Sequence, residues 1–217
     1  MIDPLSKYCS VQPLVRKPSL HIMSPPGFMK SQFTKLPYPE KKFTGQTIII
    51  TGANVGLGLE AARHFVRLEA AKVILAVRTI SKGEAAKKSI EDSTKRTGVV
   101  EVWEIDQENY GSVVMFAKKA QSLERLDVAI LNAGLMTPEF NMAEGHEKMI
   151  LVNVISTFLL ALLLIPKLRE TAVNFNKAPV LTCTGSFTHF DAAFPERNSE
   201  HIFEAFTKKE SAKMTDR

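Results

Sequence analysis

The chain has 217 residues, of which 45% are hydrophobic and 24% are charged, and this composition favours one soluble globular domain with a sizeable core. The formal net charge of +5 is carried by residues 1–42, which hold seven basic and two acidic side chains, whereas the remainder holds 21 of each. A neutral domain disfavours a nucleic-acid-binding surface.

Residues 1–42 differ from the rest of the chain. They contain seven of the eleven prolines and lack the apolar stretch of a secretory signal, so we expect a Pro-rich, basic, disordered arm before a domain at residues 43–217. A mitochondrial presequence is the alternative, although the arm has one arginine and too many prolines for an amphipathic helix. Cys9 and Cys183 do not suggest a disulfide framework, so we expect a reducing compartment and a cytoplasmic location.

The first pattern of the domain is a strand, a glycine-rich turn and a helix. The β-branched run Thr47–Ile50 is followed by Thr51–Gly58, with the sequence TGANVGLG, and then by a helical pattern over Leu59–Leu68. An ordinary βα loop is the alternative, but a strand before and a helix after are the context that a dinucleotide-binding loop requires.

Three glycines give this turn its predicted chemistry. Gly52 permits a tight turn that a Cβ atom would block, Gly56 lets backbone amides approach a phosphate, and Gly58 lets the helix pack closely on the sheet. The start of the helix offers free N–H groups and the positive end of the helix dipole. The sequence therefore predicts a phosphate-binding site at this turn.

The rest of the domain alternates strands with helices. Short apolar runs predict four further strands, at Lys72–Val77, Val99–Ile105, Leu126–Leu131 and Pro179–Thr184. Helical patterns lie between them, at Ser81–Lys95, Asn109–Leu123 and Gly145–Thr171. Ser81 and Glu84 match a capping box at the start of the first of these helices. The alternation predicts an α/β fold, with a doubly wound parallel sheet and helices on both faces.

Met149–Ile165 is apolar enough to raise the question of a membrane helix. Its 17 residues fall short of the roughly twenty that span a bilayer, and Asn153, Ser156 and Thr157 interrupt it. We therefore expect a buried helix and no membrane span. A helix that is apolar all round also suits an interface, so association between copies of the chain through residues 149–165 is a further expectation.

Four sequence elements stand at the ends of predicted strands or within the long helix. Thr51–Gly58 has the pattern TGxxxGxG, Leu131–Gly134 reads LNAG, Asn153 lies in the apolar helix, and Ser186 follows the last strand. In these elements and their order, the chain from about Phe43 to its last residue resembles the short-chain dehydrogenases/reductases, in particular fungal-type members. The family has NNAG where this chain has LNAG, so the leucine is a departure.

The resemblance implies a Rossmann-like fold and a nicotinamide cofactor. It places ten residues of the glycine turn and the LNAG element at the cofactor, namely Thr51, Gly52, Asn54, Val55, Gly56, Leu57, Gly58, Asn132, Ala133 and Gly134. It also places Asp106, at the end of the third strand, near the adenine, and the alternative for Asp106 is a helix cap before Asn109.

Arg78 bears on the choice of cofactor. It ends the second strand, where an acidic residue would bind the ribose 2′-hydroxyl of NAD(H) and an arginine pairs with the 2′-phosphate of NADP(H). The planar guanidinium of Arg78 suits such a contact, and Lys82 can assist it. A solvated arginine is the alternative, and the sequence favours NADP(H).

The family reaction is hydride transfer between the nicotinamide and a small carbonyl or alcohol substrate. The resemblance implies that Ser186 hydrogen-bonds the substrate oxygen, and that Asn153 keeps the long helix locally bent and supports a proton-relay water. A tyrosine would exchange the proton, and a lysine four residues later would lower its pKa. The alternatives are a small turn residue for Ser186 and a satisfied core amide for Asn153.

The required Tyr-x-x-x-Lys is absent from its place after Ser186. Tyr8 and Tyr110 are not followed by a lysine at the fourth position, and the one match, Tyr38 with Lys42, lies at the end of the arm, before the glycine turn. Residues 208–217, KKESAKMTDR, resemble the stretch that leads into the catalytic tyrosine of fungal-type members, so we expect a chain that stops just before it and lacks the C-terminal strands. The strand at Pro179–Thr184 is then expected to form an open sheet edge, and the isolated chain to be poorly soluble or to associate.

The sequence thus predicts an NADP(H)-dependent oxidoreductase by family, whose 217 residues are themselves inactive. A non-catalytic NADP-binding or partner-binding protein is the alternative, and a membrane-associated protein is ranked last. His189 and His201 stand without a cysteine or carboxylate cluster at ligand spacing, so no metal site is expected.

Overall fold

The computed structural model describes residue 30 and residues 33–186, 192–212 and 214. The chain divides into two compact units, Met1–Glu40 and Lys41–Arg217, and the elements below belong to the second. The predicted arm at residues 1–42 lies mostly outside the described residues, and Tyr8, Cys9 and His189 lie outside them as well.

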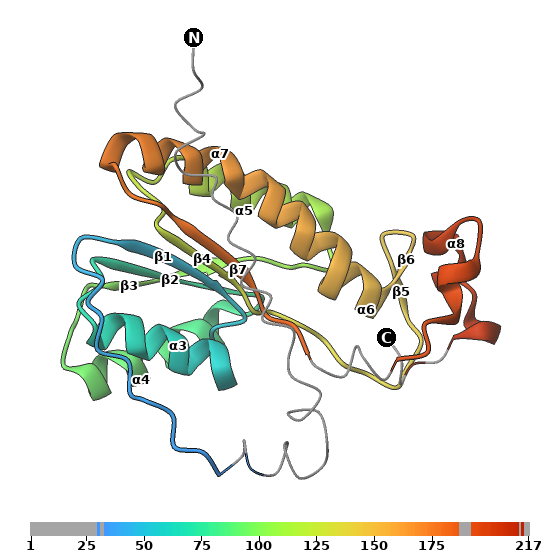
Figure 1. The fold of residues 1–217 in the computed structure, drawn as a ribbon, viewed down its shortest axis with the longest axis horizontal. Coiled ribbons are helices and arrows are strands. Elements are labelled where there is room, and N and C mark those ends of the chain that lie inside the picture. The colour runs from blue at the N-terminus through green and yellow to red at the C-terminus, as the bar shows by residue number, and fades with distance from the viewer. Residues whose placement is uncertain (1–29, 31–32, 187–191, 213, 215–217) are drawn as a thin grey trace. The chain divides into compact units, whose positions relative to one another are not determined.

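Five parallel strands form one sheet, in the spatial order β3-β2-β1-β4-β7 (Figure 1). Their bounds are β1 Thr47–Thr51, β2 Lys72–Val77, β3 Val100–Glu104, β4 Val128–Leu131 and β7 Val180–Cys183. Ile48 of β1 pairs with Val73 of β2 on one side and with Val128 of β4 on the other. The chain builds outward from β1 to β3 and then returns to β4, so the strand order reverses between β1 and β4. The predicted parallel sheet is confirmed, and this reversal is where such sheets bind ligands.

Four long helices cover the two faces of the sheet in the part of the chain that the structure describes (Figure 1). One face carries α3 (Gly56–Arg67) and α4 (Ile80–Thr94), and the other carries α5 (Tyr110–Gln121) and α7 (Thr157–Phe175). Helices on both faces of a parallel sheet confirm the predicted doubly wound α/β fold.

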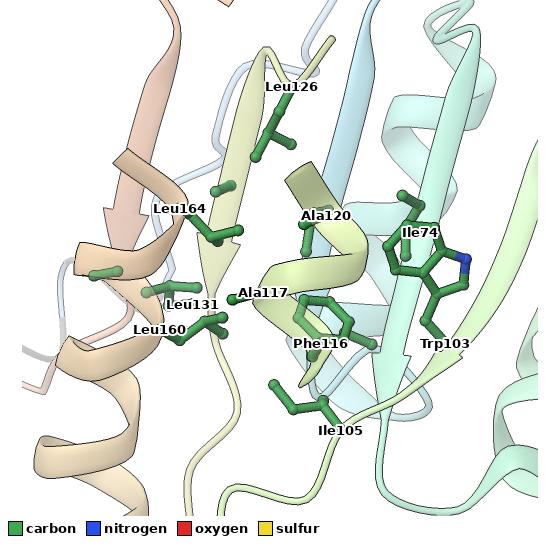
Figure 2. Close-up of a cluster of buried hydrophobic side chains, with 14 of the residues drawn as sticks. Ile74, Trp103, Ile105, Phe116, Ala117, Ala120, Leu126, Leu131, Leu160 and Leu164 are labelled. Atoms are coloured by element: carbon green, nitrogen blue, oxygen red, sulfur yellow. The ribbon is translucent and has the colours of Figure 1, made fainter. Parts of the chain in front are cut away.

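Side chains of the strands alternate between two buried clusters, one on each face of the sheet. Ile48 and Ile50 belong to the cluster under α3 and α4, whereas Ile49 belongs to the cluster under α5 and α7. Figure 2 shows the second cluster, in which Phe116 of α5 and Leu160 of α7 are directed toward the strands. All three isoleucines are fully buried. Burial of each side chain contributes about 1.5–3 kcal/mol to folding.

The starts of α4 and α5 test two capping interpretations. The N-cap of α4 is Thr79, and Ser81 lies inside the first turn, so the predicted Ser81 capping box is wrong. The helix starts earlier because the N–H of Gly83 donates to the carbonyl of Thr79 and closes the first turn there. Asn109 does cap α5, since its Oδ1 accepts the N–H of Ser112 at 2.8 Å.

The long apolar helix begins later than predicted. A short antiparallel hairpin, β5 (Met142–Ala143) and β6 (His146–Glu147), occupies the predicted start, with Gly145 at φ +79° in its turn. A left-handed residue interrupts a helix, so the predicted start at Gly145 is wrong. The helix starts instead with α6 (Lys148–Ile150), which Glu147 caps by accepting two backbone N–H groups of the first turn.

After α6 the helix continues through η2 (Leu151–Ser156), a π-helix, and then through α7. Lys148–Phe175 is long and apolar enough to cross a membrane by length and composition alone. Its most apolar 18-residue stretch has a mean hydropathy of 2.5, and half of that stretch is buried in the fold. Leu160 is fully buried, whereas Phe158 and Leu162 on α7 are 57% and 65% exposed. One side of this helix is therefore core, and the other presents apolar side chains to solvent.

β7 forms one edge of the sheet, because the described residues place a strand beside it only at β4. Val180 at the start of β7 is 54% exposed. This geometry agrees with the open edge that the sequence predicted. Beyond it the described chain forms short helices, η4 (Pro195–Asn198), α8 (Ile202–Phe206) and η5 (Lys209–Ser211).

Candidate functional site

The turn between β1 and α3 uses its glycines for different purposes. Gly52 has φ +66°, and a Cβ atom there would lie 2.9 Å from the Cα atom of Ala133. A Cβ atom on Gly58 would lie 2.5 Å from the carbonyl oxygen of Gly52, so α3 packs against the turn only with glycine at that position. Gly56 has φ +57°, and a Cβ atom there would face open space. The tight-turn and close-packing reasons for Gly52 and Gly58 agree with this geometry, and the open side of the turn lies at Gly56.

Thr51 joins this turn to the LNAG element at the end of β4. Its Oγ1 atom accepts the backbone N–H groups of Asn132 at 3.0 Å and of Ala133 at 2.9 Å. In return the Asn132 side-chain amide donates to the carbonyl of Thr51 at 3.2 Å. Thr51 is 1% exposed, so this connection is shielded from water. It fixes the two loops against each other at the point where the strand order reverses.

A cleft of about 220 Å³ opens at the carboxyl ends of the strands. Seven of the predicted cofactor residues line it, namely Gly52, Asn54, Arg78, Lys82, Asp106, Ala133 and Gly134. Thr51 and Asn132 hold its wall through the bonds just described, whereas Val55 and Leu57 are 64% and 77% exposed beside it. The structure thus brings residues from four connections to one cleft, where open parallel sheets bind their ligands.

The start of α3 fits an anionic group. The helix begins at Gly56, three residues before the predicted Leu59, and its N-cap Val55 makes no side-chain hydrogen bond to the first turn. The first N–H groups of a helix have no partner within it, and here the N-cap side chain supplies none. A Cβ atom at Gly56, the first residue of the helix, would face open space, so the residues present fit the pyrophosphate of a dinucleotide.

Charged side chains gather at the rim of the cleft beyond β2 and β3. Arg78 Nη1 donates to Glu108 Oε1 at 2.5 Å, and Lys148 Nζ lies 2.8 Å from the other oxygen, Oε2. The Arg78 side chain is 65% exposed. The N–H of Glu108 donates to Asp106 Oδ1 at 2.9 Å, so Asp106 organises this turn and also lines the cleft. Arg78 is therefore paired as well as solvated. Asp106 lines the cleft, and its helix-cap alternative is wrong, because the N-cap of α5 is Asn109 and the side chain of Asp106 accepts from Glu108, outside the helix.

Asn153 lies in the π-helix η2. Its Oδ1 accepts the N–H of Leu135 and its Nδ2 donates to the carbonyl of Leu135, both at 2.8 Å. The wider turn exposes the carbonyl of Val152, which accepts from Thr157 Oγ1 at 2.9 Å and from Gln107 Nε2 at 3.3 Å. The side-chain amide of Asn153 is thus hydrogen-bonded, as the core-amide alternative expects. Asn153 also lies in a locally deformed helix, and π-turns often accompany functional sites.

Ser186 lies three residues after the end of β7 and is exposed. It is not among the described residues that line the cleft. Tyr110 starts α5 and packs edge-on against His146 at a ring separation of 6.4 Å. Partial burial, and secondarily the carboxylate of Glu144, raise the pKa of Tyr110 above its ordinary value. Tyr110 does not line the cleft, and Tyr38, in the other compact unit, is 64% exposed.

Sequence reasoning missed several residues at this site, and three of them carry a charge or an amide. Gln107 and Glu108 line the cleft, and Lys148 reaches the rim through Glu108. Gln107 and Glu108 directly follow Asp106 at the carboxyl end of β3, and that position is a signal for both. Nothing in the sequence pattern points to Lys148. In the described ranges no group of three His, Cys, Asp or Glu residues is placed to hold a metal ion.

Known proteins share this sequence pattern. A family model described as short chain dehydrogenase matches residues 46–174. The short chain dehydrogenase atnD of Emericella nidulans is 50% identical over 192 residues, which cover 88% of this chain and 61% of that protein. The short-chain dehydrogenase anuD of Penicillium roqueforti is 39% identical over 216 residues, which cover 99% of this chain and 56% of that protein. The chain thus spans little more than half the length of these relatives.

Solved structures agree in fold. The short chain dehydrogenase from Shigella flexneri is 26% identical, with a TM-score of 0.58 over 78% of this chain and 64% of that chain. A protein from Escherichia coli CFT073 complexed with NADPH is also 26% identical, with a TM-score of 0.57 over 78% of this chain and 68% of that chain. The family match covers more than half of the chain, and both curated relatives exceed a third identity. The chain therefore belongs to the short-chain dehydrogenases/reductases, a family of oxidoreductases with the Rossmann fold.

Proposed function

We propose that this chain binds NADP(H) and belongs to an NADP(H)-dependent oxidoreductase acting on a small carbonyl or alcohol substrate. The observation that carries the choice of cofactor is Arg78, which directly follows β2 and lines the cleft. Lys82 lines the same cleft and adds a second positive charge. A guanidinium binds a 2′-phosphate by paired hydrogen bonds, whereas the 2′-hydroxyl of NAD(H) favours a carboxylate there.

The remaining residues have proposed roles around the same ligand. Bound NADP(H) supplies the hydride of the family reaction. The first turn of α3 binds the pyrophosphate through its amides, the LNAG loop holds the opposite wall, and Asp106 lies at the adenine end. Asn153 holds the helix above the cleft and supports a proton-relay water, and Ser186 hydrogen-bonds the substrate oxygen.

We further propose that these 217 residues do not turn over substrate. They contain no Tyr-x-x-x-Lys after Ser186, where the family motif stands, so the group that exchanges a proton with the substrate oxygen is missing from that part of the chain. A protein that binds NADP(H) or a partner without catalysis is the second candidate. Both share the cofactor site, and they differ in whether a carbonyl panel oxidises NADPH in the presence of the protein.

The test is a titration of the purified chain with NADPH and with NADH, followed by nucleotide fluorescence. Arg78→Ala removes a charge-assisted contact worth about 1.5–3 kcal/mol, which corresponds to roughly a 10- to 150-fold loss of NADPH affinity. NADH affinity should change little. Arg169→Ala, at an exposed arginine of α7, is the matched control. Equal loss of both nucleotides in Arg78→Ala would contradict the choice of NADP(H).

We also propose that Lys148–Phe175 is a core helix of a cytoplasmic protein, without a membrane span, and that its outer side joins copies of the chain. Val154, Phe158 and Leu162 are 39%, 57% and 65% exposed and are spaced four residues apart, so they form one apolar stripe. Leu162→Glu should reduce self-association in sedimentation velocity, because a charge opposes burial of the stripe. Met115→Glu, at an exposed methionine of α5, is the control. Flotation of the wild-type chain with liposomes would refute the core-helix assignment.

A further inference from the structure

Glu108 places a carboxylate between two cations at the rim of the cofactor cleft. One oxygen accepts from Arg78 at 2.5 Å and the other lies 2.8 Å from Lys148. The side chains of Glu108 and Lys148 are 22% and 27% exposed, whereas that of Arg78 is 65% exposed. The acid and the lysine are thus the shielded pair, and the arginine is the partner that is open to solvent.

Hydrogen bonds anchor the backbone of Glu108 and the backbone of Lys148. The N–H of Glu108 donates to Asp106 Oδ1 at 2.9 Å, and the N–H of Asp106 donates to Ser112 Oγ at 2.9 Å. On the other side the N–H of Lys148 donates to the carbonyl of Asn141 at 2.9 Å, which anchors the lysine at the start of α6. Glu108 therefore stays beside Arg78, and any anion that approaches the guanidinium meets a fixed negative charge.

Such a charge acts differently on the two nicotinamide cofactors. The 2′-phosphate of NADP(H) is a dianion that must share Arg78 with Glu108 and is repelled by it. The 2′-hydroxyl of NAD(H) carries no charge and meets no such repulsion. Lys148 neutralises part of the charge on Glu108 and so weakens its competition for Arg78.

We propose that Glu108 is a specificity-determining residue that competes with the 2′-phosphate for Arg78 and so narrows the preference of the site for NADP(H) over NAD(H), and that Lys148 limits this competition. The inference rests on the proposed NADP(H) site. Because the carboxylate is partly exposed, solvent screens its effect to a modest size.

Glu108→Gln separates charge from position. Glutamine has the same shape and keeps one oxygen that can accept from Arg78, whereas its NH2 group cannot accept from Lys148, so the change removes the negative charge together with the acceptor that faces Lys148. We expect NADPH to bind about three- to tenfold more tightly in a fluorescence titration of the full chain, and NADH affinity to stay within about twofold. The gain in NADPH affinity should shrink as salt is raised from 50 to 500 mM, since screening weakens repulsion in the wild type.

Glu101→Gln is the matched control. Glu101 lies on the same strand, β3, and its carboxylate is also paired, with Lys72 Nζ at 2.6 Å. It lies near the start of the strand, and the cleft lies at the other end, so this change should leave the ratio of the two affinities unaltered. Urea midpoints of both variants establish that each is folded under the conditions of the titration.

Lys148→Gln tests the second half of the proposal. This change should weaken NADPH binding in the wild-type background. The loss of NADPH affinity should be smaller in the Glu108→Gln background, because Lys148 acts through the carboxylate of Glu108. Equal effects in the two backgrounds would overturn the role of Lys148. Unchanged or weaker NADPH binding in Glu108→Gln would overturn the role of Glu108, because the carboxylate would then serve only to support Arg78. A wild-type chain that binds neither nucleotide, or prefers NADH, would refute the proposed function and this inference with it.

Discussion

Replacing Thr51 by valine should weaken the fold by about 2–4 kcal/mol. The hydroxyl of Thr51 accepts two backbone N–H groups, those of Asn132 and Ala133, at 3.0 and 2.9 Å. Valine has nearly the same shape but no acceptor, so both N–H groups lose their partner, and each loss costs about 1–3 kcal/mol. The lower half of that range applies, because Asn132 and Ala133 are only partly buried. Urea denaturation followed by circular dichroism measures the change as a shift in midpoint at constant slope.

Thr51→Ser is the control that isolates the hydroxyl. Serine keeps both hydrogen bonds and loses one buried methyl group, which costs about 0.8 kcal/mol. Thr51→Val should therefore be clearly less stable than Thr51→Ser. If the two variants unfold at the same urea concentration, the hydroxyl does not hold the glycine turn to the LNAG element, and the explanation of how the two loops are fixed is wrong.

Two further predictions concern packing and acid stability. Gly58→Ala should cost about 1–3 kcal/mol in urea denaturation, because its Cβ atom would lie 2.5 Å from a backbone oxygen, whereas Gly185→Ala, with open space around it, should stay within about 0.5 kcal/mol. Equal costs would refute the close-packing role of Gly58. A hydrogen bond from Lys72 lowers the pKa of the Glu101 carboxylate, so its stabilisation is present above the unfolded value and is lost as pH falls below about 4.5. Solvent screening limits it to less than about 1 kcal/mol. The difference in urea midpoint between wild type and Glu101→Gln should vanish between pH 5 and pH 3, and a difference independent of pH would contradict the assignment.

The sheet was predictable because its signals are local. Continuous apolar runs such as Lys72–Val77 match strands covered on both faces, and that strand has the predicted bounds. The start of the long helix was not predictable from periodicity, because the apolar pattern continues back toward a hairpin turn that depends on Gly145 in a left-handed conformation. The predicted cap at Ser81 was wrong for a similar reason, since the N-cap of α4 is Thr79, two residues earlier. Backbone conformation sets where each of these two helices starts, and the pattern of apolar and polar side chains does not indicate that conformation.

Site residues were predictable from the sequence where the geometry or the charge of the site requires one particular residue type. The glycines of the turn and Arg78 after β2 are of this kind, and the structure gathers Gly52 and Arg78 at one cleft. Glu108 and Lys148 are charged residues of ordinary appearance in the sequence, and they acquire a role only because β3 and α6 bring them together. A contact between residues forty positions apart depends on the fold, and no pattern in the neighbouring sequence indicates it.

The π-helix η2 makes the length of this segment as important as its composition. A regular helix advances about 100° per residue, and a π-turn accommodates one residue more than a regular turn does. Deleting one residue within Leu151–Ser156 would therefore restore a regular turn and leave α7 close to its present phase, whereas deleting one residue from the regular part of the helix would rotate everything beyond it by about 100°. Such a rotation ahead of Leu160 would turn Leu160 and Leu164 away from the strands that they cover. We therefore expect the long helix to accept the loss of one residue within η2 and to reject it in the regular turns that follow.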